Sequence, residues 1–176
     1  WISTLVGFAL LILLGWTFLT LLKNYQWKVE GISSFLANPW LPVGLWVLIL
    51  VFQFLVPIEA NANQTAVVTF MQKQPLIGFL VACVGAPILE ELLFRALLGK
   101  YLFPTIHGNG TYLLYCLLSA LAFALVHGPV SWAHWVIYGG LGFALAWMYA
   151  AKQDIRYSMG LHAANNLLSF AMTMLA

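Results

Sequence analysis

Six long apolar segments follow one another along this 176-residue chain, with short polar connections between them. A helix needs about 20 mostly apolar residues to cross the hydrocarbon core of a membrane, and each segment meets or nearly meets that length. Only 7% of the residues are charged and the mean hydropathy is +0.93, so a water-soluble fold could not bury the apolar surface. The segments are residues 2–22, 41–58, 76–102, 111–126, 130–151 and 157–175.

These segments predict an all-α fold, a polytopic transmembrane helical bundle of about six spans. Strands are not expected, because a membrane barrel would show alternating apolar and polar residues instead of unbroken apolar runs. We expect one integral domain, with residues 1–75 forming an N-terminal transmembrane hairpin and residues 76–176 forming the core. Gly139, Gly140 and Gly142 predict a close helix contact within that core.

Charge limits the partners and orients the chain. The net charge of +2 excludes a nucleic-acid partner, so the predicted partner is the lipid bilayer. The chain begins at Trp1 and not at Met, from which we expect a further N-terminal segment. Cytoplasmic connections of membrane proteins carry an excess of Lys and Arg. Lys73 stands alone on one predicted side, and the basic residues of the other, cytoplasmic side are Lys23, Lys28, Lys100, Lys152 and Arg156.

Three charged residues interrupt the third apolar segment, where ionisable groups are costly and indicate function. Glu91 and Arg95 are four residues apart on a helix, so they share a face and can form an ion pair. Glu90 points about 100° away from Glu91 and is left without that partner. An unpaired carboxylate in such a place is a candidate general base. Pro87 is expected to kink the helix beside it.

Histidines near the ends of later segments are the next candidates. Phe123 and His127 share a face of the fourth segment, and equal counts from the intervening turn place His127 at about the depth of Glu90. His134, near the start of the fifth segment, is interpreted as an ordinary interfacial residue.

The last segment holds His162 and Asn166, which share a helix face that can point into the bundle. The adjacent Asn165 points elsewhere and is expected to take no part in the site. Counting along straight helices separates His162 from His127 by about 20 Å. Either tilted helices or a last helix that begins deep in the membrane would be needed to bring them together.

Three short motifs thus occur in order in successive apolar segments. Together they resemble the CAAX protease and bacteriocin-processing (CPBP, also Abi) family of intramembrane proteases, which includes the type II CAAX prenyl endopeptidases. The resemblance covers about residues 85–170 and implies an all-helical intramembrane endopeptidase. The motifs are Glu90-Glu91-x-x-x-Arg95, Phe123-x-x-x-His127 and His162-x-x-x-Asn166.

The resemblance also implies a role for each motif residue. Glu90 would activate the attacking water, His127 would share that water, and His162 and Asn166 would stabilise the oxyanion. Glu91 and Arg95 then keep the structural role inferred from their spacing, and Phe123 supports the site.

Cofactor, substrate and location follow as expectations. A metal-free mechanism is favoured, and zinc bound by Glu90, His127 and His162 is the alternative. The expected substrate is a membrane-associated peptide or a prenylated protein, and the expected location is the bacterial cytoplasmic membrane. The competing hypotheses are a non-catalytic bacteriocin-immunity factor or scaffold, in which the polar cluster only packs, and a small transporter, which the lack of an inverted repeat disfavours.

Overall fold

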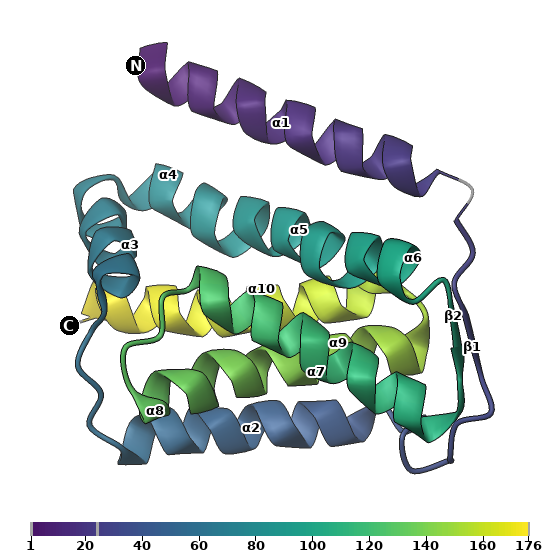
Figure 1. Cartoon of the computed structure of the whole chain (residues 1–176). Coiled ribbons are helices and arrows are strands. Elements are labelled where there is room, and N and C mark those ends of the chain that lie inside the picture. Colours follow the sequence, from purple (N-terminus) through teal and green to yellow (C-terminus); the bar gives the residue numbers. More distant parts are fainter. Residues whose placement is uncertain (1, 24, 176) are drawn as a thin grey trace.

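The structure, a computed structural model, describes residues 2–23 and 25–175, so Trp1 and the expectation attached to it lie outside the described residues. Most of the described chain is helical, and the helices run back and forth between two ends of an elongated bundle (Figure 1). In chain order the elements are α1 (Ile2–Leu22), β1 (Lys28–Glu30), α2 (Trp40–Leu55), α3 (Ala62–Lys73), α4 (Pro75–Phe79), η1 (Leu80–Gly85), α5 (Ala86–Glu91), η2 (Leu92–Leu97), α6 (Leu98–Leu102), β2 (Thr105–His107), α7 (Gly108–Val126), α8 (Trp132–His134), η3 (Trp135–Gly139), α9 (Gly140–Lys152) and α10 (Ile155–Leu175).

Each of the six predicted apolar segments contains helix, so the mostly helical fold is confirmed. Among the described residues, two helices are long and apolar enough to cross a membrane by length and composition, Pro75–Leu102 and Gly108–Val126. Shorter apolar helices occupy Ile12–Leu22 and Trp40–Leu55. The C-terminal helix α10 is long but carries His162, Asn165 and Asn166, which lower its hydropathy.

The helix from Pro75 to Leu102 alternates between α-helical and π-helical turns. The π-helical segments η1 and η2 lie on either side of α5, which carries Glu90 and Glu91. A π-helical turn widens the helix and changes which carbonyl groups its N–H groups reach, and such turns occur frequently at functional sites. Pro87 itself lies in the α-helical stretch between these π-helical turns, and the kink expected at this residue stays a prediction.

A small pair of strands departs from the all-helical prediction. β1 pairs in parallel with β2, with Lys28 opposite Thr105 and Glu30 opposite His107. The indole Nε1 of Trp27 also donates a hydrogen bond to the carbonyl of Phe103, at 2.7 Å. Such short pairing shows no alternating pattern in the sequence, and it joins the first and third connections at one end of the bundle (Figure 1).

Helix α3 lies in a segment that the sequence analysis treated as a connection. It is upright in Figure 1, across the end of the bundle opposite the strands. Asn61 begins it: its side chain accepts a hydrogen bond from the N–H of Gln64, and the Gln64 side chain accepts one from the N–H of Asn61. This reciprocal capping box is a sequence signal for a helix start, and it could have revealed α3.

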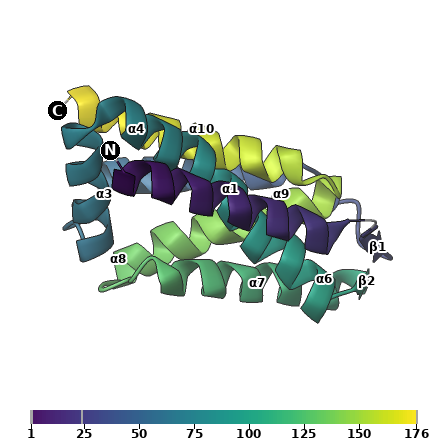
Figure 2. The same cartoon turned by 90° about the horizontal axis from the view of Figure 1, so that it is seen from above.

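The first two long helices do not pack against each other as a hairpin. α1 lies along one side of the bundle, against α5 and η2, and α2 lies on the opposite side, against α9 (Figure 1). Seen from above, α1 lies over the middle of the bundle, between α10 and α7 (Figure 2). Helices from the predicted N-terminal part and from the predicted core therefore pack together in one bundle.

Close packing between α7 and α9 sets the frame of that bundle. A Cβ atom added to Gly142 would lie 3.0 Å from Ala120 Cα and 3.2 Å from Ala120 O, so α9 approaches α7 at backbone distance. Gly140 instead faces Ile49 of α2, 2.9 Å from such a Cβ. Nothing lies within 4 Å of a Cβ at Gly139, so the expectation of a close contact fails there.

Replacing Gly142 with alanine is expected to destabilise the bundle. The added methyl group would push α9 away from the Ala120 backbone, and such overpacking lowers the free energy of unfolding by about 1–3 kcal/mol. Gly139→Ala is the matched control, since it gives the same gain in helix propensity without a contact. Denaturant unfolding in detergent micelles measures the free energy of unfolding of each variant. Equal stability of the two variants would contradict the close contact between Gly142 and Ala120.

Candidate active site

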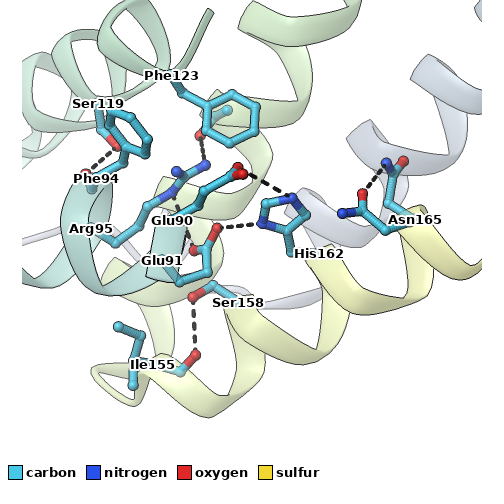
Figure 3. Close-up of polar contacts among 12 residues, drawn as sticks. Glu90, Glu91, Phe94, Arg95, Ser119, Phe123, Ile155, Ser158, His162 and Asn165 are labelled. Atoms are coloured by element: carbon cyan, nitrogen blue, oxygen red, sulfur yellow. Dashed lines mark hydrogen bonds and ion pairs between the residues drawn. The ribbon is translucent and has the colours of Figure 1, made fainter. Parts of the chain in front are cut away.

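A fully buried ion pair lies at the centre of the site. Arg95 Nε is 3.2 Å from Glu91 Oε2, and both side chains are 0% exposed (Figure 3). Their four-residue spacing on one helix brings them together, as the sequence predicted. Burying two charges is tolerated only when each is compensated, so Glu91 and Arg95 depend on each other.

Arg95 is enclosed by groups from two further helices. Its guanidinium carbon lies 4.5 Å from the centre of the Phe123 ring of α7, within the range of cation–π attraction. Its Nη2 donates to the carbonyl of Gly142 in α9, at 3.4 Å. The guanidinium therefore joins three helices around the carboxylate that it neutralises.

His162 makes a second contact to Glu91 that the sequence analysis did not foresee. The imidazole Nδ1 lies 2.9 Å from Glu91 Oε1, and His162 is 2% exposed (Figure 3). A carboxylate can only accept a hydrogen bond, so Nδ1 is the donor. Glu91 therefore links Arg95 of its own helix to His162 of α10, and it fixes which nitrogen of His162 faces Glu90.

Glu90 lies beside two imidazole nitrogens. Its Oε2 is 3.9 Å from His127 Nε2 and 3.8 Å from His162 Nε2, and the Glu90 side chain is 28% exposed. The oxygen itself is buried and accepts no hydrogen bond from any described residue. These distances exceed a direct hydrogen bond, so the two Nε2 atoms lie beside the Glu90 carboxylate without bonding to it.

His127 is oriented by its own helix. Its Nδ1 lies 2.7 Å from the carbonyl oxygen of Phe123, one turn earlier, so Nδ1 donates and Nε2 is turned toward Glu90. The centre of the Phe123 ring lies 4.3 Å from that of His127 and 5.6 Å from that of His162. Phe123 therefore contacts both histidines, and the gap expected between straight helices is closed because α7 and α10 are inclined to each other (Figures 1 and 2).

Asn166 points at the distorted part of the Glu90 helix. Its Nδ2 donates to the carbonyl of Ala82, at 2.8 Å. In η1 the N–H of Ala86 bonds to the carbonyl of Val81, five residues earlier. At the same spacing the partner of Ala82 would be residue 87, and proline has no N–H. Pro87 thus leaves a carbonyl free, and Asn166 uses it.

Asn165 takes part in the same network, against expectation. It is only 9% exposed, its Oδ1 accepts a hydrogen bond from Trp46 Nε1 at 3.1 Å, and its Nδ2 donates to Asn166 Oδ1 at 3.3 Å. Trp46 lies on α2, which has no motif residue. The helix periodicity points Asn165 away from His162, so it gave no indication that Asn165 joins the network. The only sequence feature that could have indicated this is the presence of two adjacent amides in an apolar segment.

The residues proposed for a metal converge without forming a metal cluster. Glu90, His127 and His162 offer one oxygen and two nitrogens, which is a donor set that zinc accepts. In the described part of the chain, however, no group of three His, Cys, Asp or Glu side chains has the spacing of a metal site. We therefore derive no step through a metal ion.

Comparison with known proteins places the chain in a family. The family model described as Type II CAAX prenyl endopeptidase Rce1-like matches residues 72–168, more than half of the chain, and the match includes every site residue named above from Glu90 to Asn166. The chain therefore belongs to the Rce1-like family of CAAX proteases. The resemblance noted in the sequence is confirmed, and together with the apolar helices it identifies an integral membrane protein.

Two curated proteins are similar over part of their length. The "Membrane-embedded CAAX protease MroQ" of Staphylococcus aureus (strain USA300) is 28% identical over 127 residues, which cover 65% of this chain and 50% of that protein. The "Putative membrane peptidase YdiL" of Bacillus subtilis (strain 168) is 28% identical over 95 residues, covering 54% and 36%. The chain thus spans half or less of these relatives. No solved structure matches.

Replacing Pro87 with alanine is expected to release Asn166. The new N–H would compete for the Ala82 carbonyl, and loss of a hydrogen bond worth about 1 kcal/mol corresponds to roughly fivefold faster exchange of the Asn166 side-chain amide protons. Nuclear magnetic resonance of protein labelled at asparagine with ¹⁵N measures this exchange. The control is Pro75→Ala, at the start of α4. Unchanged Asn166 exchange in Pro87→Ala would disprove the link.

Proposed function

We propose that this protein is an intramembrane endopeptidase in which Glu90 activates a water molecule that attacks the scissile carbonyl. One observation carries the proposal: the Nε2 atoms of His127 and His162 lie 3.9 and 3.8 Å from the same Glu90 oxygen. Glu91, the adjacent carboxylate, is engaged by Arg95 and His162. Of these two carboxylates, Glu90 is therefore the one that is free to take a proton.

The proposed reaction divides the site into a base and an oxyanion site. Glu90 takes a proton from the water while His127 Nε2, whose other nitrogen donates to Phe123, holds that water in place. The water oxygen bonds to the scissile carbonyl carbon, and the carbonyl oxygen becomes an oxyanion. The C–N bond then breaks, and Glu90 returns the proton to the leaving amine.

Two side chains of α10 would stabilise the oxyanion. Asn166 Nδ2 carries two hydrogens, of which one is used by Ala82 O and the other is free to donate. His162 donates through Nδ1 to Glu91, so it offers a second donor at Nε2 when doubly protonated. Both donors are held by neighbouring groups before a substrate binds, which is what electrostatic stabilisation of a transition state requires.

The proposed mechanism is metal-free. Each histidine donates through Nδ1 to a fixed acceptor, which directs both Nε2 atoms toward Glu90, where they are available to hydrogen-bond to water or to the substrate. A carboxylate assisted by imidazoles can supply the general-base step without a metal ion.

We propose that the chain crosses the bacterial cytoplasmic membrane about six times. The six apolar segments and the alternation of their helices between two ends of the bundle support this (Figure 1). The excess of basic residues around the strand pair supports a cytoplasmic location for that end. The proposed substrate is a peptide that is itself in the membrane or attached to it by a lipid, and the family name favours a prenylated protein.

The Glu90→Gln variant is expected to lose peptidase activity while keeping its fold. Removal of a general base lowers kcat by about 10²–10⁴-fold. The contacts of Glu90 with His127 and His162 are longer than hydrogen bonds, so the fold should not depend on them. Purified protein in lipid nanodiscs would be offered a farnesylated CAAX peptide and the same peptide without the lipid, with product termini identified by mass spectrometry.

Glu59→Gln is the matched control, because Glu59 is exposed in the connection before α3 and should leave kcat unchanged. Glu91→Gln is expected to lower the free energy of unfolding, because it leaves Arg95 buried without its counter-charge. Full activity of Glu90→Gln would overturn the mechanism. Absence of cleavage by the wild-type protein on both peptides would favour the non-catalytic alternative for these substrates.

A further inference from the structure

Three aromatic rings are stacked behind the proposed water site. The centre of the Tyr138 ring lies 4.8 Å from that of His127, with the two planes at 29°, and 5.9 Å from that of His134, with the planes at 12°. His134 is 1% exposed and Tyr138 is 8% exposed. His134, interpreted from the sequence as an ordinary interfacial residue, is buried in the protein beside Tyr138.

His134 is fixed on the far side of this stack. Its Nδ1 lies 3.1 Å from Ser131 Oγ and accepts a hydrogen bond from the N–H of Val130, at 3.4 Å. The Ser131 side chain also accepts from the N–H of His134 and caps the short helix α8. The His134 ring is thus tied to the chain around it, and Tyr138, one helical turn later, packs against a ring that cannot easily turn.

His127 is held between two rings. Phe123 covers one side, with its centre 4.3 Å from that of His127 and a 34° angle between the planes, and Tyr138 covers another. The backbone is held as well, because Asn61 Nδ2 donates to the carbonyls of His127 and Gly128, each at 2.9 Å. Rotation of the imidazole would disturb both ring contacts and break the bond from Nδ1 to the Phe123 carbonyl.

We propose that Tyr138, supported by His134, is a positioning residue that keeps His127 Nε2 directed at Glu90. The proposal rests on the proposed function only in assigning that orientation a role in catalysis. Tyr138 belongs to the π-helical turn η3, and such turns redirect side chains at functional sites. The contact uses the face of the ring, so phenylalanine should preserve it and leucine should remove it.

Catalysis provides the first test. In Tyr138→Leu, kcat should fall by roughly tenfold or more with KM unchanged, because a small loss of orientation slows the chemical step more than binding. Tyr138→Phe should stay within about twofold of wild type. The matched control is Tyr149→Leu, a buried tyrosine stacked on Trp27 at 4.8 Å and 15°, which should lower stability but not the kcat of folded protein.

A second measurement does not depend on peptide cleavage. With ¹⁵N-labelled histidine, nuclear magnetic resonance should show His127 as a single form protonated at Nδ1 in the wild type and in Tyr138→Phe. Tyr138→Leu should show a second form or broadened signals. His134→Ala, which removes the ring behind Tyr138 and keeps the Tyr138 side chain, should change the His127 signals in the same direction, and it serves if Tyr138→Leu does not fold.

The outcomes separate the two proposals. If the wild-type protein cleaves neither peptide, the proposed function fails, and the His127 spectra still decide whether Tyr138 orients that ring. If the wild-type protein is active and Tyr138→Leu and His134→Ala leave both kcat and the His127 signals unchanged, the positioning role is overturned. A fall in kcat equal to that of Tyr149→Leu, without a change at His127, also overturns it.

Discussion

The buried ion pair between Glu91 and Arg95 is the interaction on which the rest of the site depends. Two adjacent carboxylates in an apolar helix repel each other unless one is neutralised, and Arg95, one turn later, does this for Glu91. Once Glu91 is fixed, its second oxygen holds His162 Nδ1 and turns Nε2 toward Glu90. This pair thus leaves Glu91 fully engaged and leaves Glu90 as the carboxylate that we propose as the base.

Packing around Phe123 turns this local arrangement into a rigid one. The ring lies against the Arg95 guanidinium and contacts the rings of His127, at the C-terminal end of α7, and His162, within α10. Gly142 lets α9 approach the same turn of α7 and supplies the carbonyl that accepts from Arg95. The site is therefore held by four helices. Every motif residue lies within a helix except His127, which directly follows α7 and whose carbonyl accepts a hydrogen bond from Asn61.

The sequence was sufficient for the helices and for the motif residues, because long apolar runs and i, i+4 spacing are local properties. It could not show the contact between His162 and Glu91, which are 71 positions apart and meet because α10 packs against α5. It also could not show that the His134 side chain is buried, because its packing against Tyr138 in this part of the bundle depends on the tertiary structure. The missed helix α3 differs, since Asn61 and Gln64 did carry a capping signal.

The division of labour between Glu90 and Glu91 is tested most directly by following oxygen from water. A single turnover in H₂¹⁸O, with the peptide product and the Glu90-containing peptide analysed by mass spectrometry, reports which atom attacks the carbonyl. Activation of water by Glu90 predicts one ¹⁸O in the new carboxyl group of the product and none in Glu90. Label in Glu90, or a first-turnover product without label, would show attack by the carboxylate itself and would contradict the account.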